Sequence, residues 1–324
     1  MAKLAFNSKF SESHFSKNLD VFVGLSGGAD SIALLHYLNE MNKSNEIGSL
    51  KAIHVNHGYS PESKKWENFC KDFCNNHNIE FTATSIPNLD STASLEGSFR
   101  KARFKIFANI LRTPAVLALG HHMNDQVETI LFRMFRGSGP EGISGINEVS
   151  IVDEVKVLRP MLKIEKDEIY EYVEKHNLQY IHDHSNDDEQ FDRNFIRSKL
   201  IPLISERWPA AIKKISDLSE LSQQDIEFKN IFLEQRIEEF RSESGLNILS
   251  LSKVSEIERT YIIRHWIKKN GFSQPNRKTQ LEIEKIFFCS QTTSNSSVQW
   301  SRADNAQKSC KMFTDKKSLI IKEP

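Results

Sequence analysis

Residues 21–31 of the chain read VFVGLSGGADS, and residues 32–38 continue as IALLHYL. The apolar start of the first stretch predicts a buried strand and the second stretch predicts a helix, so a glycine-containing turn joins the two. Gly27 and Gly28 lack the Cβ that would keep backbone NH groups away from phosphate oxygens. The start of a helix adds unpaired NH donors and a partial positive charge. This order of elements predicts a phosphate-binding turn.

Three polar side chains in the same turn suit a nucleotide. Ser26 and Ser31 add hydroxyl donors, and the Asp30 carboxylate can hold Mg²⁺. The alternative is a serine-capped strand-to-helix turn without a ligand, and the number of suitable residues in register after the strand favours the phosphate site.

The turn resembles the SGGxDS signature of the PP-loop, or N-type, ATP pyrophosphatases. This resemblance implies cleavage of ATP between its α- and β-phosphates. The chain contains no G-x-x-x-x-G-K-[ST] motif, so the apparatus for transferring a γ-phosphate is missing. Residues 137–142 match G-x-G-x-x-G, but they follow the helix-like stretch 129–136, whereas a dinucleotide-binding fingerprint follows a strand. We therefore do not expect NAD binding there.

Strand-like and helix-like segments alternate through the first third of the chain. After the first strand and helix, we expect strands at 50–55, 79–84 and 115–119, with helices within 62–77 and 96–111. This alternation predicts an α/β fold with a doubly wound, mostly parallel sheet, and the resemblance implies the adenine nucleotide alpha hydrolase type. Ligands bind at the carboxyl ends of such strands, so one crevice is expected to gather Ser26, His54, His57, Gly120 and His121.

The pattern after residue 160 is helical, and 217–243 repeats apolar residues at helical spacing. We place a domain boundary near 215. Residues 1–215 are predicted to form the ATP-binding catalytic domain. Residues 216–324 are predicted to form an acidic connector helix followed by a smaller, mostly helical substrate-binding domain.

Length and composition are typical of a globular protein of about two domains. No apolar run approaches the roughly 18 residues needed to cross a bilayer, and the first residues lack a signal-peptide core, so a cytoplasmic location without membrane contact is expected. The four cysteines form no C-x-x-C pair, which gives no indication of a zinc or iron-sulfur site. They are Cys70, Cys74, Cys289 and Cys310.

Charge is balanced over the whole chain, with 43 basic and 43 acidic residues, but unevenly distributed. Residues 217–252 contain three basic and eight acidic residues, whereas 253–324 contain fourteen and seven. The basic end is either a surface that faces RNA or an ordinary solvated face, and charge alone does not separate the two.

Further motifs are similar to one branch of the PP-loop enzymes, the tRNA(Ile)-lysidine synthetases. They cover nearly the whole chain in order: HVNHG at 54–58, Glu96 with Arg100 and Arg103-Phe104, GHHMNDQVET at 120–129, RGSG at 136–139, RP at 159–160, DHSN at 183–186, RNFIR at 193–197, WP at 208–209, and Arg259, Arg264, Trp266, Gly271 and Pro275. The resemblance implies modification of the wobble cytidine in the CAU anticodon of tRNA(Ile), with ATP, Mg²⁺ and L-lysine. Oligomeric state stays open between monomer and homodimer.

The resemblance and the local chemistry together assign candidate residues. Asp125 and Glu128, three residues apart, share one helix face and suit the incoming lysine ammonium, although acidic residues also favour any exposed first helical turn. His121 is a candidate base at the crevice, and Arg103, Arg193 and Arg197 are candidates for phosphate or tRNA contacts. The alternative is that the histidine fills a structural role and that the arginines are ordinary surface residues. The expected nucleotide-binding residues are Ser26, Gly27, Gly28, Ala29, Asp30, Ser31 and His54, and Asp30 is also the expected catalytic metal ligand.

The chain departs from the family pattern at three places. Asn124 occupies the usual position of the first aspartate in H-H-x-D-D-Q-x-E-T, which weakens a metal or substrate role there. Gly97 and Phe99 replace small alanines, which suggests altered helix packing. The chain ends without the additional C-terminal domain of longer members, so we expect more tRNA discrimination in what remains.

Three alternative functions each require a feature that distinguishes them from a lysidine synthetase. A tRNA cytidine thiolase shares the activation chemistry, but it would need clustered cysteines and resembles SGGKDS where this chain has Ala29. A glutamine-dependent amidotransferase would need a glutaminase domain, which is not apparent. A non-catalytic nucleotide-sensing or RNA-binding module would bind ATP without releasing AMP and pyrophosphate.

Overall fold

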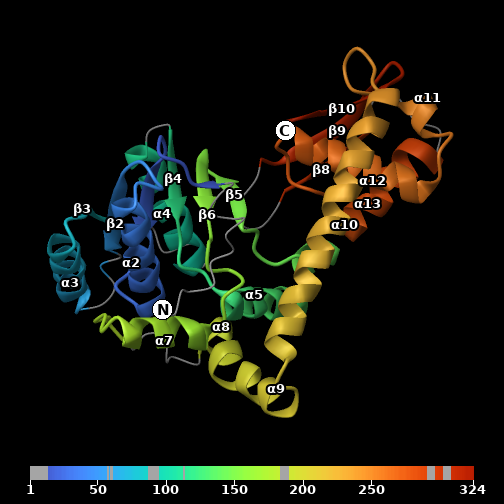
Figure 1. Ribbon diagram of the computed structural model, residues 1–324. Coiled ribbons are helices and arrows are strands. Elements are labelled where there is room, and N and C mark those ends of the chain that lie inside the picture. The colour runs from blue at the N-terminus through green and yellow to red at the C-terminus, as the bar shows by residue number, and fades with distance from the viewer. Residues whose placement is uncertain are drawn as a thin grey trace. The chain divides into compact units, whose positions relative to one another are not determined.

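The structure, a computed structural model, describes residues 14–56, 58, 61–86, 95–111, 114–182, 190–289, 296–301 and 308–324. It divides into two compact units, Met1–Gln223 and Gln224–Pro324, and the boundary falls inside the helix α10 (Ala211–Glu239). Figure 1 shows the course of the chain.

A six-stranded sheet with the order β3-β2-β1-β4-β6-β5 forms the centre of the first unit. Its strands are β1 (Asp20–Gly24), β2 (Leu50–Asn56), β3 (Glu80–Ser85), β4 (Ala115–Ala118), β5 (Val149–Val152) and β6 (Val155–Leu158). All neighbours pair in parallel except β5 and β6, which form an antiparallel hairpin. Asp153 and Glu154 both have positive φ in its turn, as a two-residue type I′ hairpin requires. The predicted mostly parallel α/β sheet is confirmed.

Helices connect the strands and cover both faces of the sheet, as expected for a doubly wound fold. They are α2 (Ala29–Lys43), α3 (Ser63–Asn76), α4 (Leu95–Ile110), α5 (Met123–Phe135), α6 (Pro140–Ile143), α7 (Lys166–Lys175), α8 (Asp192–Phe195), the π-helix η2 (Ile196–Leu200) and α9 (Ile201–Arg207).

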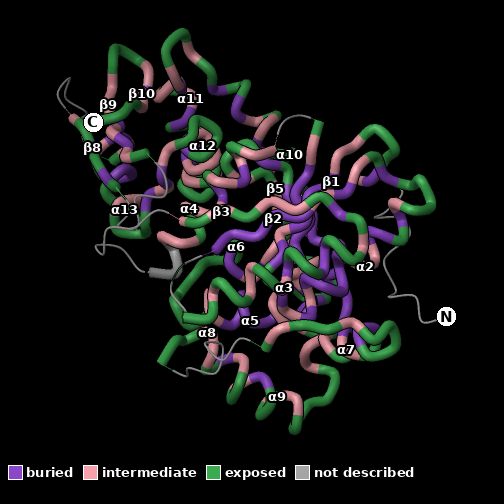
Figure 2. Tube along the Cα trace, turned by 90° about the vertical axis from the view of Figure 1, so that its left-hand side faces the viewer, coloured by how far each residue is buried: buried purple, intermediate pink, exposed green. Residues whose placement is uncertain are grey.

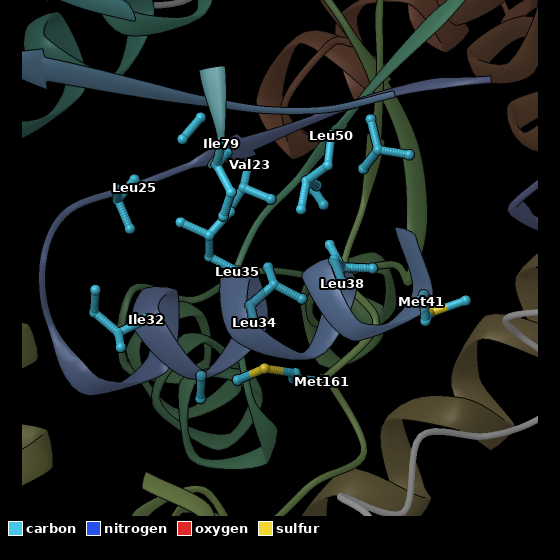
Figure 3. Packing of buried hydrophobic residues seen from close by; sticks show 14 of the residues in the cluster. Val23, Leu25, Ile32, Leu34, Leu35, Leu38, Met41, Leu50, Ile79 and Met161 are labelled. Atoms are coloured by element: carbon cyan, nitrogen blue, oxygen red, sulfur yellow. The ribbon is translucent and has the colours of Figure 1, made fainter. Parts of the chain in front are cut away.

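Alternation along β1 separates the two hydrophobic cores. Val21 and Val23 pack into the core that holds α2, α3 and α7, whereas Phe22 points to the opposite face and packs with α4. Figure 3 shows Ile32, Leu35 and neighbouring α2 side chains against the strands. Figure 2 shows burial concentrated on the central strands. Burial on both faces explains why these strands read as continuous apolar runs.

The strand order places a topological switch point between β1 and β4. From β1 the chain proceeds through α2 to β2 and then to β3, on one side of β1, and it returns to the other side as β4. The connections that leave the carboxyl ends of β1 and β4 therefore run in opposite directions, and this is the position at which sheets of this kind bind ligands.

A cluster of histidines lies between α2, α3 and the end of α7. His36 Nδ1 lies 2.8 Å from Tyr172 Oη, and its ring centroid lies 4.9 Å from that of His176 and 6.0 Å from that of His77. Burial lowers the pKa of His36 to about 4, His176, His77 and Lys43 act in the same direction, and Glu40 opposes them.

We expect this histidine to make the protein less stable in acid. A pKa that is lower in the folded than in the unfolded state means that unfolding takes up a proton, so stability is full above pH 6.5 and falls as the pH drops towards 4. The variant His36→Gln keeps a hydrogen-bonding side chain for Tyr172 but does not titrate. Its melting temperature should fall less than that of the wild type between pH 6.5 and 4.5. Equal slopes for the two proteins would contradict this assignment.

The second unit contains helices and an antiparallel sheet of order β7-β10-β9-β8. Its elements beyond α10 are β7 (Leu246–Asn247), α11 (Ile248–Leu251), α12 (Glu256–Lys269), α13 (Arg277–Glu284), the π-helix η3 (Lys285–Cys289), β8 (Ser297–Trp300), β9 (Cys310–Asp315) and β10 (Ser318–Lys322). The predicted helices are present, and the sheet is an addition that the sequence pattern does not indicate. Ile263 of α12 packs with Met312 and Leu319 of the sheet in one core.

Among the described residues, none of the helices combines the length and apolar character that spanning a bilayer demands.

Candidate active site

The turn between β1 and α2 has a backbone shape that requires glycine. Gly27 has φ +93°, and a Cβ there would lie 2.9 Å from Ile181 Cδ1 and 3.2 Å from Cys70 Sγ. The Gly27 carbonyl accepts a hydrogen bond from Ile181 N at 2.8 Å, which fixes the peptide from the opposite side. The Gly27 peptide is therefore held in a conformation that favours glycine, and the glycine pair leaves this part of the turn without side chains.

Hydroxyl groups hold this turn in place. Ser31 Oγ accepts hydrogen bonds from Ser26 N and Gly27 N, each at 3.2 Å, and donates to Gly28 O at 3.0 Å. Ser26 Oγ accepts from Gly28 N at 3.3 Å and is the exposed hydroxyl of the pair. Ala29 begins α2, where NH groups have no partner within the helix. Ser31 thus preforms the turn, and Ser26 faces solvent.

The end of β4 lies directly against the first turn of α2. A Cβ on Gly120 would lie 3.0 Å from the carbonyl carbon and oxygen of Asp30 and 3.2 Å from Ser31 N. To admit a Cβ at these distances, the backbone of Asp30 and Ser31 would have to shift by a few tenths of an ångström, so glycine favours this close approach. The contact brings the residues after β4 beside the phosphate-type turn, although about ninety positions separate them in the sequence.

Asp30 carries the least satisfied oxygen of this region. Its Oδ1 is buried and accepts no hydrogen bond from the described residues, and His122 Nε2 lies 3.7 Å away. Burial raises the pKa of Asp30, and the charges of His122, Lys166 and Arg197 oppose this rise. A buried carboxylate oxygen without a donor at a helix start fits Mg²⁺, which uses one or two protein carboxylates and completes its shell with phosphate and water oxygens.

The first turn of α5 supplies a second carboxylate. His122 caps this helix: its Nδ1 accepts from Asn124 N at 3.2 Å, and Asp125 Oδ2 accepts from His122 N at 2.9 Å. His122 Nε2 also lies 3.5 Å from Asp125 Oδ2. Burial alone would raise the pKa of Asp125, but His122, its backbone NH and other neighbouring charges outweigh burial and hold the pKa below its usual value. Asp125 is therefore a carboxylate that stays ionised.

Glu128 lies one turn further along α5 and is paired with Arg197 of η2. The Arg197 Nε and Nη2 atoms donate to Glu128 Oε2 at 2.9 and 2.7 Å, and Nη2 lies 3.7 Å from Asp125 Oδ1. Burial raises the pKa of Glu128, although the Arg197 guanidinium opposes the rise. The predicted shared face of Asp125 and Glu128 is present, with Arg197 between the two carboxylates.

His121 follows β4, and the charge of Arg103, in α4, acts on it. His121 Nδ1 is buried and has no hydrogen bond within the described part of the chain. Burial lowers the pKa of His121 to about 4, Asp125 opposes this, and Arg159, Arg100 and Arg103 act with burial. His121 is therefore neutral at pH 7 and able to take up a proton. Arg159, just after β6, is only 2% exposed, and its Nη1 donates a hydrogen bond to Asn147 O at 2.7 Å.

The remaining predicted residues have protein partners. His54 is buried near the end of β2, and its Nδ1 lies 2.8 Å from Leu25 O. This contact helps to fix the backbone where the turn begins. Asn124 Oδ1 accepts from Lys166 N at 3.3 Å and ties the first turn of α5 to the start of α7. This contact gives the asparagine a positioning role that the sequence did not reveal. His57 and residues 183–186 lie outside the described residues.

Two arginines of the second unit are also held by protein groups. Arg259 is buried, and its Nε donates to Glu284 Oε2 at 3.0 Å. Arg264 donates to Pro275 O at 2.7 Å and to Gln274 Oε1 at 2.9 Å. Both guanidiniums therefore help to build this unit.

Comparisons with known proteins identify the family of the chain. The model of the PP-loop domain family matches residues 3–204. The tRNA(Ile)-lysidine synthase of Wigglesworthia glossinidia brevipalpis is 35% identical over 86% of this chain and 72% of its own length. That of Buchnera aphidicola subsp. Schizaphis graminum is 33% identical over 85% of this chain and 62% of its own. A solved U34-tRNA thiolase, NcsA from Methanococcus maripaludis with its [4Fe-4S] cluster, has 20% identity and a TM-score of 0.52, covering 67% of this chain and 79% of its own, which supports the fold alone.

The chain spans 60 to 72% of the length of these and similar curated relatives. The match includes the phosphate-type turn and the α5 carboxylates, and the family model alone covers more than half of the sequence. The protein belongs to the PP-loop family and, within it, to the tRNA(Ile)-lysidine synthases.

Proposed function

We propose that the protein ligates lysine to carbon 2 of the wobble cytidine in the CAU anticodon of tRNA(Ile), consuming ATP and releasing AMP and pyrophosphate. The observation that carries the proposal is the juxtaposition of two sites: the glycine turn with Asp30, suited to a magnesium triphosphate, and the ionised Asp125, suited to an ammonium. His122 lies between them, within 3.7 Å of both carboxylates. We place the reaction in the cytoplasm, where buried thiols such as Cys70 stay reduced.

In the first step, oxygen 2 of the cytidine attacks the α-phosphorus of ATP, and the bond between the α-phosphorus and the bridging oxygen breaks. The turn at Gly27 and Gly28 would hold the departing pyrophosphate, with Asp30 as the residue that holds Mg²⁺. When bound, Mg²⁺ supplies positive charge that stabilises the pyrophosphate oxygens. Adenylation turns a poor leaving group into an AMP ester.

In the second step, the lysine amine attacks carbon 2, and AMP leaves with oxygen 2 of the cytidine. Asp125 would orient the substrate by pairing with an ammonium group of lysine, and Arg197 keeps Glu128 fixed beside it. The attacking amine must lose a proton, and His121, which is neutral at pH 7, would accept it. The basic residues of 253–324 would add electrostatic attraction for the tRNA.

We expect Asp125→Asn to raise the KM for lysine by about ten- to a hundredfold, because it removes one charge-assisted contact. Glu128→Gln should raise it less, because Arg197 occupies that carboxylate. Steady-state kinetics with varied lysine at saturating ATP and tRNA measure both effects. Glu154→Gln in the β5–β6 turn is the exposed control. An unchanged lysine KM in both site variants would exclude a lysine-binding role for this pair.

The whole proposal is tested by incubating the protein with ATP, radiolabelled lysine and total tRNA, followed by nucleoside analysis. We expect label in a modified cytidine, and release of AMP and pyrophosphate only when tRNA and lysine are both present. Nucleotide binding without this release would indicate a sensing or RNA-binding module. Incorporation of sulfur instead of lysine would indicate a thiolase.

A further inference from the structure

The first turn of α7 is fastened to the first turn of α5. Met123 N donates a hydrogen bond to Ile164 O at 2.9 Å, and Asn124 Oδ1 accepts one from Lys166 N at 3.3 Å. Lys166 is the first residue of α7, so its backbone lies beside the helical turn that contains Asp125. Figure 1 shows α7 beneath α2, at the same end of the sheet as α5.

The segment after α7 returns to the glycine turn. The ring of Tyr180 packs edge-on against that of Tyr170, with the two centroids 5.9 Å apart. The next residue, Ile181, donates its backbone NH to Gly27 O at 2.8 Å. Tyr170 therefore belongs to a stretch of chain that is tied at one end to α5 and at the other end to the glycine turn.

Lys166 and Tyr170 share one face of α7. They are four residues apart, and helical spacing places them next to each other. The Nζ atom of Lys166 lies 5.5 Å from the centroid of the Tyr170 ring, which is a cation–π contact. Both residues are partly exposed. The ring thus helps to hold the ammonium group in place without neutralising its charge.

Lys166 is the uncommitted cation beside Asp30. Burial raises the pKa of Asp30, and the charges of His122, Lys166 and Arg197 oppose this rise. His122 caps α5 through its Nδ1 atom, and the Arg197 guanidinium donates to Glu128. Within the part of the chain that the structure describes, Lys166 pairs with no carboxylate. Its charge is therefore available to a bound anion.

The terminal phosphates of ATP are the anion that this position suits. Residues 26–31 contain no lysine or arginine, and a magnesium triphosphate keeps a net negative charge, so a cation must come from elsewhere in the fold. Lysine binds phosphate as a compact point charge. The carboxylate of the substrate lysine is the other anion, but burial, His122 and His121 have the largest effects on the pKa of Asp125. Lys166 is thus associated with the carboxylate proposed for Mg²⁺ rather than with the one proposed for lysine.

We propose that Lys166 is a catalytic residue of the first step, in which its ammonium group pairs with the β- and γ-phosphates of ATP and then with the departing pyrophosphate. When the bond between the α-phosphorus and the bridging oxygen breaks, its electron pair stays on the pyrophosphate, and Lys166 stabilises that negative charge without giving up a proton. Tyr170 is a positioning residue that acts through Lys166. This assignment rests on the proposed function and adds a cation that the glycine turn does not contain.

The test compares ATP with AMP, because AMP lacks the two phosphates in question. Isothermal titration calorimetry with the full chain and Mg²⁺, in the absence of tRNA, gives both dissociation constants. Lys166→Met should weaken ATP binding by about tenfold, the effect of losing one charge-assisted contact, and should leave AMP binding unchanged. Inhibition by pyrophosphate should weaken by the same factor. The KM for lysine should stay at the wild-type value.

Conservative variants separate charge from packing. Lys166→Arg should restore most of the ATP affinity because it keeps the positive charge, whereas Lys166→Gln should behave like Lys166→Met. Tyr170→Phe keeps the aromatic face and should bind ATP more tightly than Tyr170→Leu. The matched control is Lys175→Gln, which removes an exposed charge from the other end of the same helix. It should bind both nucleotides as the wild type does.

Wild-type affinity for ATP in both Lys166→Met and Lys166→Gln, with the wild type itself binding ATP and forming lysidine, would overturn this inference alone. Equal losses for ATP and AMP would indicate that Lys166 only supports the fold. A rise confined to the KM for lysine would indicate that it binds the carboxylate of that substrate. Either result refutes the phosphate role. A wild type that neither binds ATP nor forms lysidine would overturn the proposed function and the inference together.

Discussion

Asp30→Asn is expected to lower ATP-dependent release of pyrophosphate by about a hundred- to a thousandfold, the size of effect seen when one charge-stabilising group is removed from an active site. The amide keeps the shape of the side chain but cannot hold Mg²⁺ as a carboxylate does. The change should not lower the stability of the folded protein. Burial raises the pKa of Asp30, so the ionised carboxylate opposes folding at neutral pH, and its removal should leave the melting temperature equal or slightly higher.

The measurement pairs pyrophosphate release in the presence of tRNA with thermal melting at pH 7. Glu40→Gln, on the exposed end of the same helix and paired with Lys43, is the control and should keep full activity. The combination of lost activity with retained stability separates a functional carboxylate from a structural one. A variant that melts well below the wild type, or that releases pyrophosphate at the normal rate, would refute the role given to Asp30.

Arg197→Met is expected to lower the free energy of unfolding by about 2 kcal/mol, because it leaves the Glu128 carboxylate buried without its cation. The side chain of Glu128 is 5% exposed and that of Arg197 is 40% exposed, so the value should lie below that of a fully buried pair. Lysine ligation should be lost as well, since the same guanidinium fixes the acidic face. Chemical denaturation of the single and double variants gives the energies.

The pH dependence of this deficit identifies its cause. Burial already raises the pKa of Glu128 in the wild type, and loss of Arg197 should raise it further. The deficit of the variant should therefore shrink as the pH falls from 7 to 5 and the carboxyl group becomes neutral. Glu128→Gln/Arg197→Met should recover much of the lost stability at pH 7. A deficit that is independent of pH and of residue 128 would point to lost packing instead.

The sequence predicts most of the first unit because its signals are local. Three features are contiguous in the sequence: the apolar run before Gly27, the glycine pair and the helix that follows. Each is determined by residues that are close to one another along the chain. Asp125 and Glu128 share a face because helical spacing places them there. The confirmed α/β sheet follows from strands that are buried on both faces and alternate with amphipathic helices.

The contacts that define the site are not local, and the sequence pattern does not reveal them. The pairing of Glu128 with Arg197 joins positions 69 residues apart, and the support of Leu25 by His54 depends on the register of two strands. The approach of Gly120 to Asp30 is visible only in space. The sheet of the second unit is built from short strands, one of them two residues long, and such strands carry too little periodicity to distinguish them from loops.

The π-helix η2 separates Arg197 from the helix α9 that follows it. A π-helix contains one residue more per hydrogen-bonded loop than an α-helix. Removal of a single residue from this widened turn would restore ordinary winding and rotate everything after it by about 100°. Arg197 lies near the start of this widened turn and would keep its contact with Glu128, whereas α9 would turn relative to that pair. The extra residue thus sets the angle at which α9 leaves the active-site segment.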